Sequence, residues 1–120
     1  NQVTIKKINQ FWGLKDNNKV FFTKKIDHQT IEKFINDVNF LRNNKDVFIS
    51  MEISNYNGDE IYIDLKTNTA GFLTFVDNWS PGWKVYVNNK EKSIVKVLET
   101  YKSVKINTGY NKIRFKYEPW

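Results

Sequence analysis

Apolar and polar residues alternate with a period of two along most of the chain. Glu60–Lys66 is a clear example, because Ile61, Ile63 and Leu65 alternate with more polar neighbours. Such alternation, rich in β-branched and aromatic residues, is typical of strands with one buried face. We therefore expect strands over residues 3–8, 19–24, 47–53, 60–66, 71–77, 83–87, 93–97, 103–106 and 112–117.

One segment has a helical period instead. Ile31, Phe34, Ile35, Val38 and Leu41 recur at the spacing of one helix face. Asp27 is placed to cap the amino end, and the pair Asn43–Asn44, which tolerates left-handed geometry, is placed to end the periodic pattern. The pattern predicts one amphipathic helix near residues 28–42.

These elements together predict a mainly β fold, an antiparallel β-sandwich of jelly-roll-like type carrying one helix. Turn residues separate the strands at Asn57–Asp59, Asn88–Asn89 and Thr108–Gly109. Pro81–Gly82 suits the centre of a type II turn, in which glycine takes a positive φ. No repeat or composition shift divides the chain, so residues 1–120 are expected to form one soluble domain. The chain does not begin with Met, and we expect it to be a piece of a longer protein.

The composition limits the chemistry. The 120 residues include no Cys and one His, which excludes disulfides, thiolate metal sites and clusters of His ligands. No nucleophile motif or Gly-rich phosphate loop is present, so we expect no catalytic residues, no metal and no cofactor. His28 is interpreted as a solvated residue at the start of the helix rather than a general base. Asp37 and Asp46 are interpreted as surface carboxylates that favour solubility.

The net charge of +6 raises nucleic acid and anionic membranes as partners. The 19 basic residues are dispersed among acids, no basic run exceeds two, and only Arg42 and Arg114 are arginines. This distribution favours a solvated lysine surface that also protects strand edges over a nucleic-acid site.

The most unusual segment runs from Asp77 to Val87 and contains two tryptophans around the Pro81–Gly82 turn. One interpretation is a sugar platform in which aromatic faces stack on pyranose rings and polar groups bind hydroxyls. The other, which the residue types favour, is that Trp83 and Tyr86 fill the end of the sandwich while Trp79 covers it. The candidate ligand-binding residues are Asp77, Asn78, Trp79, Trp83 and Tyr86.

Two blocks of the C-terminal half resemble a known family. The sequence Pro81-Gly82-Trp83-Lys84, followed by a strand and an Asn turn, and the ending Tyr117-Glu118-Pro119 are similar to the C-terminal extracytoplasmic domain of the YfhO family of bacterial multi-pass membrane proteins. Where that family often has glycine in the turn after the first block, this chain has Asn88–Asn89, which can serve the same turn.

The resemblance implies a parent protein related to membrane glycosyltransferases that use lipid-linked sugars, with its catalytic acid in the membrane portion. This chain would be a noncatalytic accessory domain on the extracytoplasmic side, in the periplasm or at the cell surface. Its expected partners are its own transmembrane portion, a cell-envelope glycan and an anionic membrane surface, and not nucleic acid. The alternative is a structural or protein-interaction β-sandwich with no ligand of its own.

Overall fold

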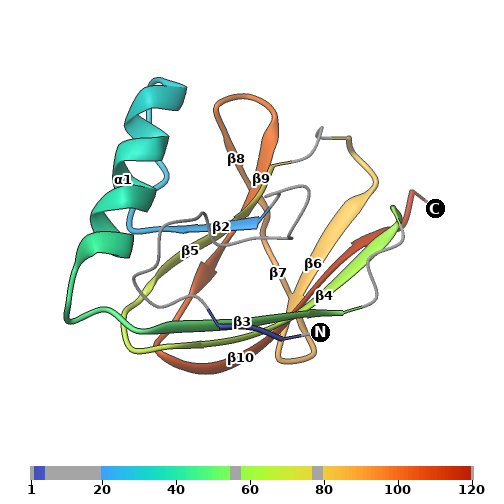
Figure 1. Cartoon of the computed structure of the whole chain (residues 1–120). Coiled ribbons are helices and arrows are strands. Elements are labelled where there is room, and N and C mark those ends of the chain that lie inside the picture. Colours follow the sequence, from blue (N-terminus) through green and yellow to red (C-terminus); the bar gives the residue numbers. More distant parts are fainter. Residues whose placement is uncertain (1, 5–19, 55–57, 77–79, 120) are drawn as a thin grey trace.

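A computed structural model describes residues 2–4, 20–54, 58–76 and 80–119 of the chain. Within these residues all strand pairs are antiparallel and form two sheets that face each other (Figure 1). Sheet A has six strands in the order β1 (Gln2–Thr4), β3 (Ile49–Ser54), β4 (Glu60–Thr67), β10 (Gly109–Tyr117), β6 (Trp83–Val87) and β7 (Lys90–Lys92). Sheet B has four strands in the order β2 (Val20–Thr23), β5 (Gly71–Phe75), β9 (Tyr101–Ile106) and β8 (Val95–Val97).

The β-sandwich expected from the sequence is therefore confirmed. The core lies between the sheets and includes Phe22, Ile61, Phe75 and Phe115, all fully buried. Residues 5–8 of the first predicted strand and Asp77 at the end of another lie outside the described residues. The short strand β7 was not expected, because its sequence Lys-Glu-Lys has no apolar alternation. All three of its residues are exposed in the structure.

Helix α1 (Ile31–Asn43) packs beside β2 at one side of the sandwich (Figure 1). Its buried residues are Phe34, Val38 and Leu41, and the Phe34 ring contacts those of Phe21 and Tyr101 at 5.8 and 6.0 Å between centroids. The helix and its end near residue 43 agree with the prediction.

Three details of the helix prediction are wrong. Thr30, not Asp27, caps the amino end, because its side chain accepts a 3.1 Å hydrogen bond from the Lys33 N–H. Asn44 ends the helix with an extended backbone at φ −84° rather than a left-handed one. Ile31 and Ile35 are 51% and 36% exposed, so the buried stripe is narrower than the periodicity indicated.

Two turns depend on the particular residues at their centres, Asn88–Asn89 and Pro81–Gly82. Asn88 and Asn89 have φ of 53° and 70° and join β6 to β7 in a two-residue hairpin, as expected for a primed turn. The Pro81–Gly82 turn, closed by a hydrogen bond from Trp83 N–H to Ser80 O of 3.3 Å, is not type II, since Gly82 has no positive φ. Glycine is required there for space, because a Cβ at residue 82 would lie 2.6 Å from Tyr117 Cε1.

Lys102 corrects the expectation that the lysines are solvated. It is fully buried on β9, with its Nζ 4.7 Å from the ring centroids of both Phe75 and Trp83. Aromatic faces attract a cation in this geometry. The dispersed lysines of the sequence therefore include one that belongs to the core.

Candidate functional site

The described residues of the predicted platform, Trp83 and Tyr86, lie on opposite faces of β6. Trp83 faces the sandwich interior, where its ring contacts Phe75 at 5.9 Å and Tyr117 at 5.6 Å between centroids. Tyr86 lies on the outer face, because side chains of a strand alternate and Val85 and Val87 are buried. The structure therefore does not bring these two rings together, and Asp77, Asn78 and Trp79 lie outside the described residues.

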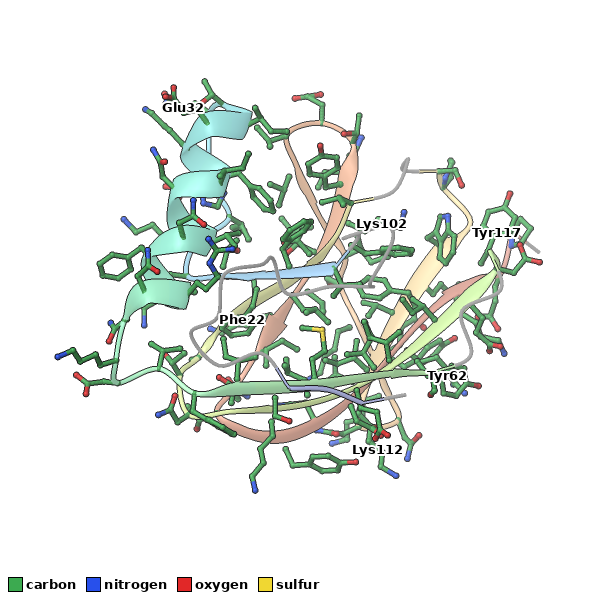
Figure 2. All side chains as sticks on the ribbon, viewed as in Figure 1. Phe22, Glu32, Tyr62, Lys102, Lys112 and Tyr117 are labelled. Atoms are coloured by element: carbon green, nitrogen blue, oxygen red, sulfur yellow. The ribbon has the colours of Figure 1, made fainter. Side chains whose placement is uncertain are left out.

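Tyr86 belongs instead to a row of side chains across three neighbouring strands. Arg114 of β10 lies opposite Tyr62 of β4 on one side and opposite Tyr86 of β6 on the other. Its guanidinium carbon is 5.7 Å from the Tyr62 ring centroid and 4.8 Å from that of Tyr86. We call Tyr62, Arg114 and Tyr86 the aromatic row. Figure 2 shows Tyr62 on the side of sheet A that faces away from sheet B.

Carboxylates fix both tyrosine hydroxyls. Tyr86 Oη donates a 2.8 Å hydrogen bond to Glu118 Oε1, and Tyr62 Oη donates a 3.2 Å bond to Glu60 Oε2. Lys116 lies between the two acids, with its Nζ 3.8 Å from Glu60 and 3.5 Å from Glu118. The rings are thus held by groups at their hydroxyl ends, which lowers the entropy lost when a ligand stacks on them.

The same contacts shift the pKa values of Tyr86, Glu118 and Arg114. The hydrogen bond to Glu118 raises the pKa of Tyr86, and the bond from Tyr86, aided by Lys116, lowers the pKa of Glu118. Hydrogen bonding with Tyr62 raises the pKa of Arg114. The shifts of Tyr86 and Arg114 both favour the protonated forms, so at neutral pH Tyr86 is a neutral phenol beside the Arg114 cation.

A groove of about 330 Å³ lies along the aromatic row. The groups that line it combine aromatic faces with hydrogen-bonding side chains of several kinds. They are Ser54, Tyr62, Ile63, Asp64, Tyr86, Asn89, Lys112, Ile113 and Arg114. The arrangement suits a polar ligand that also presents an apolar face.

Sequence reasoning identified Tyr86 but not Tyr62 or Arg114. The alternation of β4 and β10 indicates that both residues point outward from their strands. Nothing local indicates that these strands pair, because Tyr62 and Arg114 are far apart in the chain and meet only through the register of sheet A. The alternation thus indicates the outward direction of each side chain, but not that the two side chains are neighbours.

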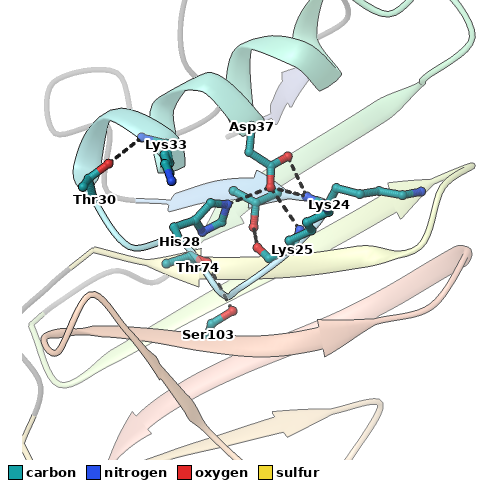
Figure 3. Close-up of polar contacts among 9 residues, drawn as sticks. Lys24, Lys25, His28, Thr30, Lys33, Asp37, Thr74 and Ser103 are labelled. Carbon is teal, nitrogen blue, oxygen red and sulfur yellow. Dashed lines mark hydrogen bonds and ion pairs between the residues drawn. The ribbon is translucent and has the colours of Figure 1, made fainter.

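The interpretations of His28 and Asp37 as solvated surface groups are wrong. The two side chains are 6% and 12% exposed, and His28 Nε2 lies 2.9 Å from Asp37 Oδ2 (Figure 3). Asp37 also accepts hydrogen bonds from the backbone N–H groups of Lys24 and Lys25 at 2.9 and 3.0 Å. Asp37 therefore ties α1 to the segment that follows β2, which explains both residues by structure rather than by catalysis.

The described ranges offer neither a metal site nor a membrane-spanning helix. They contain no group of three or more His, Asp or Glu side chains placed to hold a metal ion. In the same ranges no helix has the length and apolarity needed to cross a membrane. The aromatic row and its groove remain the arrangement best suited to binding.

The segments Pro81–Lys84 and Tyr117–Pro119 pack against each other at one end of the sandwich. Gly82 packs against Tyr117 and Pro119, and the Glu118 N–H donates a 2.6 Å hydrogen bond to Gly82 O. Trp83 packs on Tyr117, so the two segments form one contact. Comparison of the chain with protein-family models, with curated proteins and with solved structures gives no significant match.

Proposed function

We propose that this chain is a noncatalytic domain that binds a glycan on the outer face of sheet A. The observation that carries the proposal is the aromatic row, in which two tyrosine rings flank Arg114 beside a groove of about 330 Å³. Pyranose rings present C–H faces that stack on aromatic rings and hydroxyls that need polar partners. Ser54, Asp64 and Asn89 supply such partners within the same groove.

The groove has a size and rigidity that fit a small saccharide. Its volume lies near the lower end of the range of about 300–1,000 Å³ that small-molecule sites occupy. The tyrosines are held by Glu60 and Glu118 before any ligand arrives. A preformed surface of this kind binds without first ordering its own side chains.

We further propose that the domain is extracytoplasmic and belongs to a membrane glycosyltransferase-like parent, in which it positions the glycan acceptor. The proposal rests on the resemblance of Pro81–Lys84 and Tyr117–Pro119 to the YfhO family. The contact between these blocks supports it, because it gives their joint occurrence a structural role. Sequencing the complete reading frame tests this part: several apolar spans of about 20 residues are expected, and a frame without them contradicts it.

The glycan proposal is tested by titrating the chain with cell-envelope oligosaccharides and following amide chemical shifts by NMR. Saturable shifts are expected around Tyr62 and Tyr86, and Tyr62→Ala or Tyr86→Ala should weaken binding by about tenfold or more. Phe40→Ala is the matched control, because Phe40 is 65% exposed on α1 and does not line the groove. Absence of saturable binding, or equal weakening in all three variants, contradicts the proposal.

A second candidate function is a protein-interaction module. The observation in its favour is the pair Ile31 and Ile35 on one face of α1, which are 51% and 36% exposed and line a hollow beside Phe21 and Tyr101. A partner that covers this surface would protect the amides of α1 from hydrogen exchange and leave the aromatic row unchanged. Glycan-induced shifts around Tyr62 and Tyr86 therefore indicate the first function, and partner-induced protection of the α1 amides indicates the second.

A further inference from the structure

Figure 1 shows the chain passing from β7 in sheet A to β8 in sheet B. Residues around this crossing line a second cavity. Its volume is about 670 Å³, and its lining comes from both sheets. We call it the edge cavity, because β7 and β8 are the edge strands of their sheets. It does not include Tyr62, Arg114 or Tyr86.

Lys90 and Lys92 of the edge cavity lie on the other face of β7 from Glu91, which is opposite Tyr86. Lys90, Lys92 and Lys105 line the cavity, and no Asp or Glu does. Among the residues that the structure describes, none of these three ammonium groups lies within 4.0 Å of a carboxylate. The cavity therefore carries a local positive potential that an anion would lower.

The rest of the lining is half polar, from Asn88, Ser93, Asn107 and Asn111, and half apolar. Phe72, Val87, Val95 and Val104 contribute the apolar half, and Val87 and Val104 are buried members of the core. Lys90 and Lys92 lie opposite Val87 and Val85 in the β6–β7 ladder. Directly opposed residues share one face of a sheet, so the two lysines lie on the interior face of sheet A, next to apolar side chains.

We propose that the edge cavity binds an anionic amphiphile, a molecule with a carboxylate or phosphate head and an apolar body. The three lysines bind the head, and the valines with Phe72 bind the body. This ligand and its site are separate from the glycan and the aromatic row. The competing explanation for the lysines is that inward-pointing charges on an edge strand prevent pairing with another chain, which requires no ligand.

The test titrates the whole chain with four probes, the two charged amphiphiles being kept below their micellar concentrations, and follows amide shifts by NMR. Octyl phosphate and octanoate carry both features, octanol lacks the charge, and inorganic phosphate lacks the apolar body. Saturable shifts around Val87, Val95 and Val104 are expected for at least one of the first two. That probe should bind about tenfold more tightly than octanol and inorganic phosphate. The tighter of the two anions identifies whether the head is a phosphate or a carboxylate.

The double variant Lys92→Gln with Lys105→Gln should bind the anionic probes about tenfold more weakly, and that binding should depend less on salt. Both side chains are exposed, so the fold is expected to persist, and thermal unfolding checks this. Lys66→Gln, an exposed lysine of β4 outside the cavity, is the matched control. The proposal is overturned by absence of saturable shifts, by octanol or inorganic phosphate binding as tightly as the amphiphiles, or by equal weakening in the control.

Discussion

Replacing Asp37 with alanine should destabilise the fold far more than replacing an exposed carboxylate in or near α1. The substitution removes the acceptor for two backbone N–H groups and for His28. Hydrogen bonds to charged groups contribute about 1.5–3 kcal/mol each, but their losses are not additive. Lys24 and Lys25 are exposed, so water can replace the carboxylate at their N–H groups. His28 is 6% exposed, so its donor is left buried without that partner.

We therefore expect Asp37→Ala to lower the free energy of unfolding by about 2–4 kcal/mol. For a domain of this size this corresponds to a fall in Tm of about 10–15 °C. Asp37→Asn keeps one acceptor oxygen, so its free energy of unfolding should fall by about half as much. Urea denaturation at pH 7 followed by far-UV circular dichroism measures each value.

Asp46→Ala is the matched control for this prediction. Asp46 is exposed shortly after the same helix, and it takes part in hydrogen bonds through its backbone N–H and C=O, to Asn44 and Asn68. The control should stay within about 0.5 kcal/mol of the wild type. If Asp37→Ala does the same, the network around Asp37 contributes nothing to stability and the reasoning is refuted.

Three further outcomes follow from the structure. The lowered pKa of Glu118 means that its bond to Tyr86 stabilises the fold fully above about pH 4.5 and is lost as pH falls through the lower native pKa. The stability difference between wild type and Tyr86→Phe should therefore shrink on acidification, and a constant difference across an acid titration counts against the bond. Gly82→Ala should cost about 1–3 kcal/mol, because the added Cβ would lie 2.6 Å from the Tyr117 ring; unchanged Tm would contradict this packing. Glu99→Gly should raise stability by about 0.5–1 kcal/mol, because residue 99 has a φ of 69°; a lower Tm would show that the turn is not strained.

The strands were predictable because their alternation is local information. Ile61, Ile63 and Leu65 show which face of β4 is buried without reference to any other strand. The same holds for the Asn88–Asn89 turn, since asparagine tolerates the positive φ that a tight hairpin requires. The Leu98–Glu99 turn has φ of 54° and 69° in residues that carry no such signal. The pairing of β8 with β9 imposes these positive φ values on the two residues.

The binding surface was less predictable because it depends on pairing between distant strands. Tyr62 and Arg114 become neighbours through the β4–β10 register, and Trp83 and Tyr86 are separated by the pleat of their own strand. Buried charges were missed for a similar reason. Lys102 resembles every other lysine in the sequence, and its burial follows from the position of β9 beside Phe75 and Trp83.

The position of β10 has a consequence for how the chain folds during synthesis. β10 is the last described strand in the sequence, yet it lies in the middle of sheet A, between β4 and β6. During synthesis β4 and β6 therefore leave the ribosome before β10. Until β10 emerges, the edge of each strand that pairs with β10 has no partner. Contacts this distant in sequence also slow folding relative to helical domains. We expect sheet A to close only once residue 117 has left the exit tunnel, so that a translational pause before that point would expose two aggregation-prone edges.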